Sequence, residues 1–327
     1  MKKFVMVDSH TLAGTDFSPE LNLLSENGIE CVLAECKTES EIIEAVKDAD
    51  GIGLNYSPIT RNVISHMEKC KVIVRYGIGY DVVDVEAATE KGIAVCNLPD
   101  YCVDEVATHA MALILDTSRK TTLFDKSVRR GIWDSEYGYK MRRLSELTLG
   151  LIGFGNTARK LSHYAKAFDM NIIVNDPYAP QGVFDEYGVK GVNIDELFKD
   201  ADIISIHIPL NDDTKHFINK ETISKMKDGV IIINTARGPI IKIDDLLDAL
   251  DSGKIRAAGL DVVENEPITD PSSRVLNYEN LVITPHAAYN SVEASINQHT
   301  MVAETAVQVL NGKMPHNVVN RKQLLNN

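Results

Sequence analysis

The sequence is poor in cysteine, in tryptophan and in long apolar runs, and each scarcity argues against a class of protein. Its 327 residues include five cysteines and one tryptophan. No apolar run approaches the roughly 20 residues that a membrane-spanning helix needs. Cys31 and Cys36 have no second closely spaced cysteine pair with which to complete a zinc site, so we expect no bound metal. Unpaired thiols are typical of a reducing compartment, and we therefore expect a cytoplasmic protein.

Positive charge is scarce as well. The chain has 34 Lys and Arg side chains against 47 Asp and Glu, which gives a formal net charge of −13. A nucleic-acid-binding protein needs a basic face, so we expect neither nucleic acid nor a membrane as a partner. The N-terminal apolar stretch, residues 4–7, ends at Asp8 and is too short for the apolar core of a signal peptide.

Apolar runs rich in β-branched residues recur along the chain, and helix-like stretches follow them. In 39–49, for example, Ile42, Ile43 and Val46 have helical spacing. This alternation of strands and helices predicts a parallel sheet that is covered on both faces. The expected strands of the first third lie at 4–7, 30–35, 51–55, 71–77 and 93–97.

A longer apolar pattern interrupts the alternation at 103–131, where we predict a single long helix. The alternation then restarts, and the chain closes with an amphipathic helix over about 291–311. We infer two α/β domains, with the second inserted into the first. The expected strands of the inserted domain lie at 148–155, 171–176, 202–209, 230–234, 257–262 and 281–286.

Residues 148–178 carry the most specific motif of the chain. Gly153, Gly155 and Ala158 form a Gly-x-Gly-x-x-Ala pattern between an expected strand and an expected helix. The first glycine permits a tight turn, the second lets the backbone approach a pyrophosphate, and the alanine allows close helix–strand packing. Amides at the helix N-terminus would bind the pyrophosphate. Asp176, after the next strand, would bind the ribose hydroxyls and repel a 2′-phosphate, which predicts NAD rather than NADP.

Three further polar residues follow expected strands. Arg237 comes after the buried run 230–234, Glu266 follows the strand that ends at Asp261, and His286 ends the last strand. Ligands of a doubly wound sheet bind beyond the carboxyl ends of its strands. There an arginine can bind a substrate carboxylate, a histidine can exchange a proton, and a carboxylate can orient the imidazole, as hydride transfer to a 2-oxo acid requires. Taken singly, the arginine is equally consistent with a surface ion pair and the histidine with a turn.

The order of these motifs resembles that of the D-isomer-specific 2-hydroxyacid dehydrogenase family. "NDPY" and "HAAY" bring the chain nearest to the branch of C-terminal-binding proteins and phosphoglycerate dehydrogenase-like enzymes. The resemblance implies a Rossmann NAD-binding domain over 103–286, inserted into a flavodoxin-like substrate domain formed by 1–102 and 287–327. The segments that carry the resemblance are residues 75–115, "LGLIGFGNTARKL", "HIPLNDDTKHFIN", "INTARGPI", "GLDVVENEP", "NLVITPHAAY" and "NVVN".

The resemblance also implies roles for individual residues. Arg237, Glu266 and His286 would form the catalytic set of an NAD-dependent D-2-hydroxyacid dehydrogenase. Asp261 would face the nicotinamide carboxamide. The cofactor would lie against Gly153, Phe154, Gly155, Asn156, Thr157, Ala158, Asp176, His207, Ile208, Pro209, Thr235, Ala236, Arg237, Asp261 and His286.

For the substrate, the resemblance implies a second set of residues, with the amides of residues 76–78 holding the carboxylate. Tyr289 stands where C-terminal-binding proteins carry a tryptophan, which leaves the substrate's size open. Arg75 would either meet a second anionic group, such as a phosphate, or form an ion pair with a nearby aspartate. The substrate set is Asn55, Tyr76, Gly77, Ile78, Arg237 and Tyr289.

Two other interpretations remain beside the dehydrogenase. One is an NADH-responsive binding protein similar to the C-terminal-binding proteins, in which the cofactor controls a partner surface. The other, formate-type dehydrogenation, is disfavoured, because that chemistry in the superfamily pairs a glutamine with the histidine and this chain has Glu266 there. The resemblance also implies a homodimer formed through residues 103–131.

Overall fold

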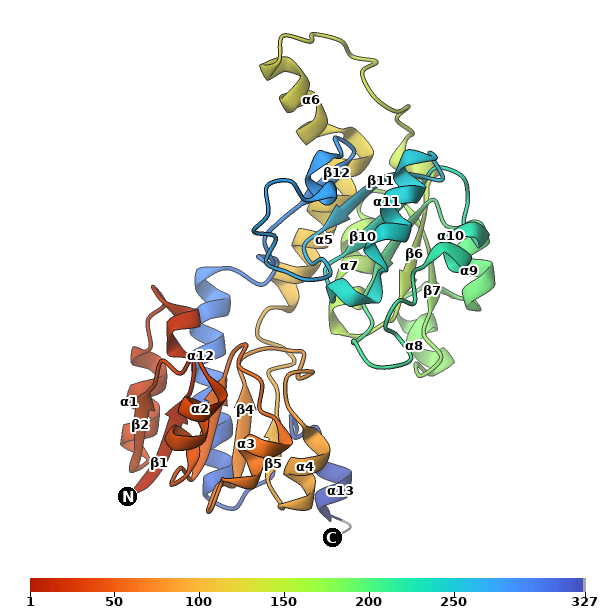
Figure 1. The fold of residues 1–327 in the computed structure, drawn as a ribbon. Helices are drawn as coiled ribbons and strands as arrows, with labels where there is room; N and C mark the ends of the chain where they lie inside the picture. Colours follow the sequence, from red (N-terminus) through yellow and green to blue (C-terminus); the bar gives the residue numbers. More distant parts are fainter. Residues whose placement is uncertain (326–327) are drawn as a thin grey trace. The chain divides into compact units, whose positions relative to one another are not determined.

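The structure, a computed structural model, describes residues 1–325 and divides the chain into two compact units. Unit 1 comprises Met1–Cys102 and Asn290–Asn327, and unit 2 comprises Val103–Tyr289. The interpretation of the sequence sets the second junction after residue 286. Each unit is built on one parallel sheet with helices packed against it (Figure 1).

The sheet of unit 1 has five parallel strands in the order β2-β1-β3-β4-β5. This is the flavodoxin-like order of a doubly wound sheet, which confirms the fold that the resemblance implies. Every expected strand of the first third overlaps an observed one. The strands are β1 (Lys2–Met6), β2 (Ile29–Leu33), β3 (Gly51–Leu54), β4 (Val72–Arg75) and β5 (Ala94–Cys96).

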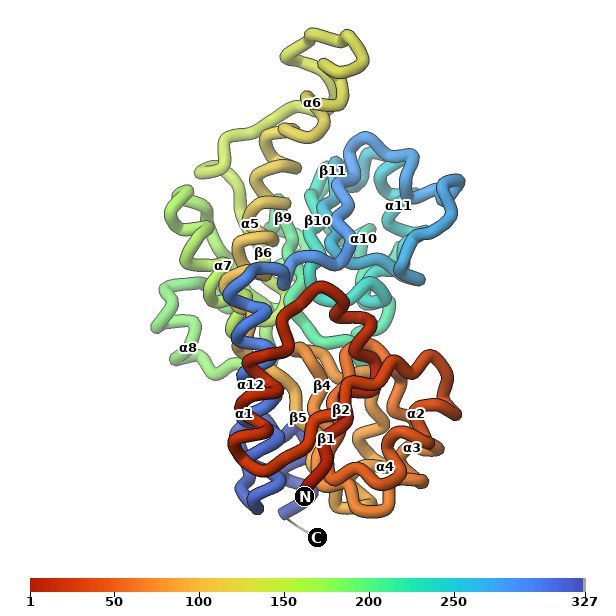
Figure 2. The backbone as a smooth tube through the Cα atoms, turned by 90° about the vertical axis from the view of Figure 1, so that its left-hand side faces the viewer, coloured from red at the N-terminus to blue at the C-terminus, as the bar shows by residue number. Residues whose placement is uncertain are grey.

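The helices of unit 1 cover its sheet, and α12 (Val292–Leu310) is the closing helix expected from the sequence. It packs against α1 (Ser18–Glu26) and β4, and Figure 2 shows α12 beside α1. Segments from the two ends of the chain therefore share one core. The remaining helices are α2 (Glu39–Val46), α3 (Arg61–Ser65), α4 (Val85–Glu90), α13 (Arg321–Leu325) and the 3₁₀ helix η1 (Ser9–Leu12).

The sheet of unit 2 has seven parallel strands in the order β12-β11-β10-β9-β6-β7-β8. This is the Rossmann order with one strand added, and its direction of winding reverses between β6 and β9. The short β8 is the one strand that the sequence pattern does not predict. The strands are β6 (Thr148–Ile152), β7 (Asn171–Asn175), β8 (Lys190–Gly191), β9 (Ile203–Ile206), β10 (Val230–Asn234), β11 (Ile255–Leu260) and β12 (Leu281–Ile283).

Strand β10 explains why this sheet needs helices on both faces. Val230 and Ile232 lie in one apolar core, and Ile231 and Ile233 lie in the other. A strand with two buried faces reads as a continuous apolar run, as the sequence indicates. The helices of unit 2 are α5 (Val103–Arg119), α6 (Thr121–Arg129), α7 (Asn156–Lys166), α8 (Gln181–Glu186), α9 (Ile194–Asp200), α10 (Lys220–Lys225) and α11 (Ile243–Asp251), with 3₁₀ helices η2 (Leu144–Glu146), η3 (Gly238–Ile240) and η4 (Arg274–Asn277).

The expectation of one helix over 103–131 is wrong. Helix α5 ends at Arg119, and Lys120 adopts a left-handed conformation with φ of 59°. The Asp116 carboxylate then accepts hydrogen bonds from the Thr122 amide at 2.7 Å and the Thr122 hydroxyl at 2.6 Å, which fixes the start of α6. The apolar spacing continues across the break, so periodicity alone does not reveal it. Helix α6 and the segment after it extend away from the sheet of unit 2 (Figure 1).

Within residues 1–325, no helix has the length and apolarity to cross a bilayer. The same residues hold no group of three or more His, Cys, Asp and Glu that could bind a metal ion. The five cysteines are free thiols, and burial raises the pKa of Cys31, Cys70 and Cys96 to about 12. These three thiols are therefore protonated at neutral pH and poor nucleophiles.

Candidate active site

The glycine-rich loop lies between β6 and α7, at the switch point of the unit 2 sheet. Gly153 has φ of 88°, and a Cβ there would stand 2.6 Å from the His207 carbonyl oxygen. A side chain is therefore excluded by both strain and space. A Cβ on Gly155 would meet nothing within 4 Å, so the helix N-terminus opens onto free space. This is the cradle that a pyrophosphate needs.

Asp176 anchors this loop through the backbone. Its carboxylate accepts hydrogen bonds from the Phe154 amide at 2.8 Å and the Tyr178 amide at 2.9 Å. The Phe154 side chain is buried and packs on Phe184 and Tyr187 in the core of unit 2, so its ring is structural. Asp176 thus anchors the loop. Its binding to the ribose hydroxyls remains a prediction.

The turn after β10 is folded by Asn234. Its side chain accepts from the Ala236 amide at 3.0 Å and donates to the Arg237 carbonyl at 2.9 Å. This turn presents Thr235, whose hydroxyl is buried without a hydrogen-bond partner in the described chain. A buried, unpaired hydroxyl is costly unless a ligand completes it, so this strand end fits a polar cofactor group.

His207 follows β9, beside the glycine loop. Its Nε2 lies 2.8 Å from the Ser205 hydroxyl, and burial lowers the pKa of the imidazole to about 4. The ring is therefore neutral at pH 7 and adds no charge near the predicted dinucleotide site. The Ile208 side chain lies close to Gly153, and the exposed Pro209 follows it.

Glu266 and His286, which are 20 residues apart in sequence, meet after β11 and β12. The Nδ1 atom of His286 lies 2.6 Å from Oε1 of Glu266. Burial acts to raise the pKa of the Glu266 carboxyl, but the His286 hydrogen bond and charge, the Val263 amide and the Arg237 charge together lower it. An ionised carboxylate only accepts, so Nδ1 carries the hydrogen of this bond.

Arg237 supplies the third predicted group of this site. Its Nη1 donates to the Ala236 carbonyl at 2.8 Å, which folds the side chain back over the turn after β10. Its charge is felt at the Glu266 carboxyl, which places the two groups in one electrostatic environment. The sequence therefore brings a guanidinium, a carboxylate and an imidazole to the same edge of the unit 2 sheet.

Asp261 holds the His286 segment in place. It is 1 % exposed, and its carboxylate accepts hydrogen bonds from the Ala287 and Ala288 amides, each at 2.9 Å. The Thr284 hydroxyl donates to the same carboxylate at 2.5 Å and therefore accepts from Nε2 of His109 at 2.9 Å. These bonds fix His286 in a left-handed conformation with φ of 53°.

The predicted substrate residues of unit 1 follow β3 and β4. The Asn55 amide donates to the buried Asp8 carboxylate at 2.8 Å. The Tyr76 amide donates to the Leu54 carbonyl and the Gly77 amide to the Arg75 carbonyl, both at 2.8 Å. Of the three amides expected to hold a carboxylate, that of Ile78 is the one with no bond to another carbonyl in the described chain. Tyr289 ends unit 2 and is half-buried.

Sequence reasoning missed three residues that shape these segments: Asp8, His109 and Thr284. Each had a signal in the sequence. Asp8 directly follows an apolar strand, His109 interrupts the apolar stripe of α5, and Thr284 stands two residues before His286. A polar residue in an apolar face indicates a buried hydrogen bond, but the pattern alone does not name its partner.

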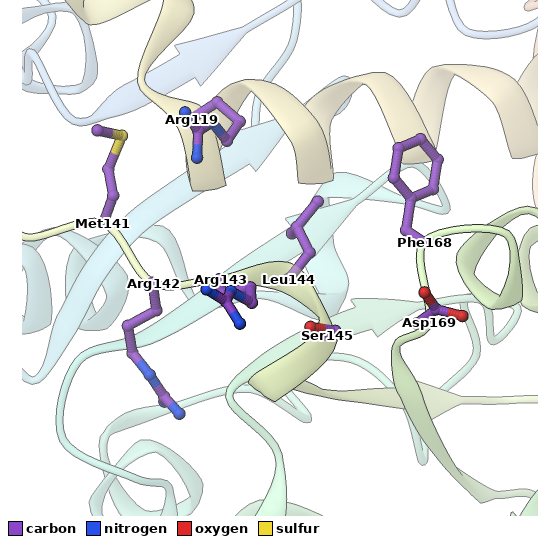
Figure 3. Close-up of a pocket in the computed structure, with 8 residues that line it drawn as sticks. All are labelled: Arg119, Met141, Arg142, Arg143, Leu144, Ser145, Phe168 and Asp169. Carbon is purple, nitrogen blue, oxygen red and sulfur yellow. The ribbon is translucent and has the colours of Figure 1, made fainter.

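A surface cavity of about 440 Å³ lies elsewhere in unit 2, at the C-terminal end of α5. Figure 3 shows Arg119 on this helix and Phe168 across the cavity from Met141. None of the residues predicted for the cofactor or for catalysis lines it. The cavity is therefore separate from the strand-end site.

A protein-family model and several relatives match this chain. Residues 111–288 match the model described as D-isomer specific 2-hydroxyacid dehydrogenase, NAD binding domain. The chain is 44% identical over 302 residues to the D-3-phosphoglycerate dehydrogenase of Methanocaldococcus jannaschii, covering 92% of this chain and 57% of that protein. It is 41% identical over 265 residues to the hydroxypyruvate reductase of Thermotoga maritima, covering 80% of this chain and 85% of that protein. The chain thus spans little more than half the length of the first relative.

Solved structures share the fold of the whole chain. The D-lactate dehydrogenase of Aquifex aeolicus, complexed with NAD and lactic acid, matches with a TM-score of 0.81 and 28% sequence identity. The match covers 100% of this chain and 98% of that one. The expected combination of two doubly wound parallel-sheet units is therefore confirmed.

The Thr284 hydroxyl gives a first prediction. Thr284→Val keeps the shape but leaves the buried Asp261 carboxylate short of one donor, so we expect the free energy of unfolding to fall by about 1–3 kcal/mol. Thr284→Ser keeps the hydroxyl and is the matched control. Urea unfolding measures both variants, and equal losses from Val and Ser would contradict the network described above.

The half-buried His207 gives a second prediction. Its folded pKa of about 4 lies below the ordinary value of 6.5, so the unfolded chain takes up the proton first as pH falls. The stability that a neutral His207 contributes is present above pH 6.5 and is lost progressively toward pH 4. As pH falls between these values, we expect the free energy of unfolding of His207→Gln to decrease by up to about 3 kcal/mol less than that of the wild type.

Unfolding at a series of pH values measures this difference. The same substitution at His163, an exposed residue of α7, is the control and should follow the wild-type profile. If the His207→Gln profile coincided with the wild type between pH 6.5 and 4, His207 would not be the neutral group of lowered pKa described here.

Proposed function

The chain belongs to the D-isomer specific 2-hydroxyacid dehydrogenase family, and from this premise we propose that it interconverts a D-2-hydroxy acid and its 2-oxo acid with NAD. The observation that carries the proposal is the His286–Glu266 pair at 2.6 Å, beside the charge of Arg237 at a strand end of the NAD-binding unit. An imidazole with one nitrogen held by a carboxylate is suited to exchange a proton through the other.

Each catalytic residue has a distinct part in this proposal. Glu266 orients His286, and Nε2 of His286 gives a proton to the oxo oxygen during reduction and takes it back during oxidation. Arg237 binds the substrate carboxylate through paired guanidinium donors. NAD, when bound, supplies the carbon that accepts or donates the hydride. In unit 1, the Ile78 amide is the donor that we assign to the carboxylate.

The residues that would hold NAD fit a dinucleotide. A Cβ on Gly155 would meet nothing within 4 Å, so there is open space before α7, and the Thr235 hydroxyl lacks a partner in the described chain. Asp176 lies at the end of β7, where a carboxylate favours ribose hydroxyls over a 2′-phosphate. We therefore propose NAD in preference to NADP.

The location and partners of the protein follow the same proposal. We propose a small 2-oxo or 2-hydroxy acid as the substrate and the cytoplasm as the compartment, because all five cysteines are free thiols. The net charge of −13 disfavours nucleic acid as a partner. The physiological acid is best identified by a kinetic screen over 2-oxo acids of graded size and charge.

Replacement of the proposed acid–base residue tests the function. Asparagine tolerates the left-handed backbone at position 286, so His286→Asn keeps the loop and removes the proton donor. We expect turnover of the best 2-oxo acid to fall by about 10²-fold or more, with the NADH dissociation constant within about twofold of the wild type. Loss of absorbance at the NADH band measures turnover, and NADH fluorescence measures binding.

The same assay separates the competing interpretations. His316→Asn, at a side chain that is 76% exposed, is the matched control and should retain wild-type turnover. Unchanged turnover in His286→Asn would show that the proton passes through another group. Tight NADH binding by the wild type without turnover of any 2-oxo acid would favour the NADH-responsive binding protein instead.

We also propose a homodimer formed through α5, α6 and the segment that follows. Trp133 is 89 % exposed, and Val128 and Ile132 beside it are also exposed, which is unusual for apolar side chains on one projecting segment. A second copy of the chain is the partner that we assign to them. A symmetric contact would bury both copies of this segment together.

The single tryptophan reports on this contact. We expect dilution below the dissociation constant of the dimer to shift the Trp133 emission to longer wavelength, because the indole becomes exposed to water. Trp133→Ala should weaken the dimer by about 10-fold or more, whereas Trp133→Phe, which keeps an aromatic anchor, should weaken it less. Sedimentation measures the dimer, and a wild type that is monomeric at every concentration would refute it.

A further inference from the structure

Three ionisable side chains of unit 1 are buried together behind the loop that follows β4. Glu20 of α1, His299 of α12 and Tyr76 are each 0–1 % exposed. Oε1 of Glu20 accepts the hydrogen bond of the Tyr76 hydroxyl, and Oε2 lies 3.0 Å from Nδ1 of His299. Buried polar groups of this kind are costly unless they hold each other in a defined arrangement.

Further hydrogen bonds fix the orientation of this cluster. The Thr15 hydroxyl donates to the Leu12 carbonyl at 2.8 Å, so it accepts from Nε2 of His299, which lies 3.2 Å away. His299 is therefore held at both ring nitrogens, by Glu20 on one side and by Thr15 on the other. Burial and the neighbouring Glu20 raise the pKa of the Tyr76 phenol well above its usual value, so the hydroxyl remains a donor.

Tyr76 is held at its main chain as well as at its hydroxyl. Nε2 of Gln298, the residue before His299 on α12, donates to the Tyr76 carbonyl at 2.9 Å. A Cβ on Gly53 would come within 2.6 Å of the Tyr76 ring, so β3 packs directly against it. Tyr76 is therefore a rigid connection between the buried cluster at one end and the loop backbone at the other.

The two following residues are restrained in the same way. The Gly77 carbonyl accepts from the Leu98 amide at 2.9 Å, and the Ile78 carbonyl accepts from Nδ2 of Asn97 at 2.7 Å. A Cβ on Gly77 would stand 1.5 Å from Nη1 of Arg75, so a larger residue there would have to displace the end of that side chain. All three carbonyls of the loop are thus occupied, and the Ile78 amide is left to face a ligand.

We propose that Tyr76, held by Glu20, His299 and Gln298, is a positioning residue that fixes the backbone of loop 76–78. In this position the Ile78 amide binds the substrate carboxylate. The inference rests on the proposed function, because it assigns that loop to the substrate. It predicts that loosening Tyr76 at either end weakens substrate binding without disturbing the cofactor unit. None of these four side chains takes part in the proton transfer assigned to His286 and Glu266.

Two variants test the two ends of Tyr76 separately. Tyr76→Phe removes the hydroxyl that Glu20 binds, and Gln298→Met removes the donor to the Tyr76 carbonyl at nearly constant volume. For the best 2-oxo acid in the kinetic screen, we expect each to raise KM by about 10-fold and to leave kcat within about threefold. The NADH dissociation constant should stay within about twofold, because the cofactor residues belong to unit 2.

A stability-matched control separates positioning from simple destabilisation. Val46 is fully buried in the last turn of α2, which leads into the amino end of β3, whereas loop 76–78 follows the carboxyl end of β4. Val46→Ala should lower the melting temperature of the protein but leave KM unchanged. Melting temperatures are measured for all three variants together with the kinetics, so that KM values can be compared between variants that lose similar stability.

Each outcome decides the inference. It is supported by a KM increase in both Tyr76→Phe and Gln298→Met that Val46→Ala does not share. It is overturned if both variants keep the wild-type KM, if only kcat falls, or if Val46→Ala raises KM equally. A wild type that turns over no 2-oxo acid overturns the proposed function itself, and the inference with it.

Discussion

The buried carboxylate of Asp261 is the interaction on which the candidate active site depends. Its hydrogen bonds to Thr284, Ala287 and Ala288 gather the chain on both sides of His286 around one charge. They hold the histidine in a backbone conformation that a non-glycine residue rarely adopts. The short bond between His286 and Glu266 forms in this setting, because the loop that carries the imidazole has little freedom to move.

Much of the fold follows from the sequence because strands buried on both faces leave a clear pattern. The run 230–234 predicts β10 to the residue, and the glycine pattern predicts the turn at Gly153, whose Cβ would collide with a neighbouring carbonyl. The prediction of one long helix over 103–131 is wrong because the break in that helix leaves no such pattern. One left-handed residue, Lys120, interrupts it while the apolar spacing continues, and no residue type at that position requires the break.

The candidate site likewise has features that the sequence predicts and features that it does not. Arg237, Glu266 and His286 stand after strands whose carboxyl ends share one edge, so topology alone predicts their approach. The hydrogen bonds that support the His286 segment come in part from elsewhere: His109 in α5, far earlier in the chain, bonds Thr284, which bonds Asp261. Sequence spacing does not encode such a long-range side-chain contact, and therefore the supporting hydrogen bonds appear only once the chain is folded.

Aspartate at the end of a buried strand has two competing uses in this protein. Asp8, Asp176 and Asp261 all follow strands. The dinucleotide pattern suggests a ligand role for Asp176, and the family resemblance implies one for Asp261. In the structure each of the three accepts hydrogen bonds from two or more backbone amides of a nearby loop. A carboxylate has about four acceptor positions, so anchoring a loop does not exhaust it. Residues of this kind can shape the loop first and meet a ligand second, and their replacement would disturb both tasks together.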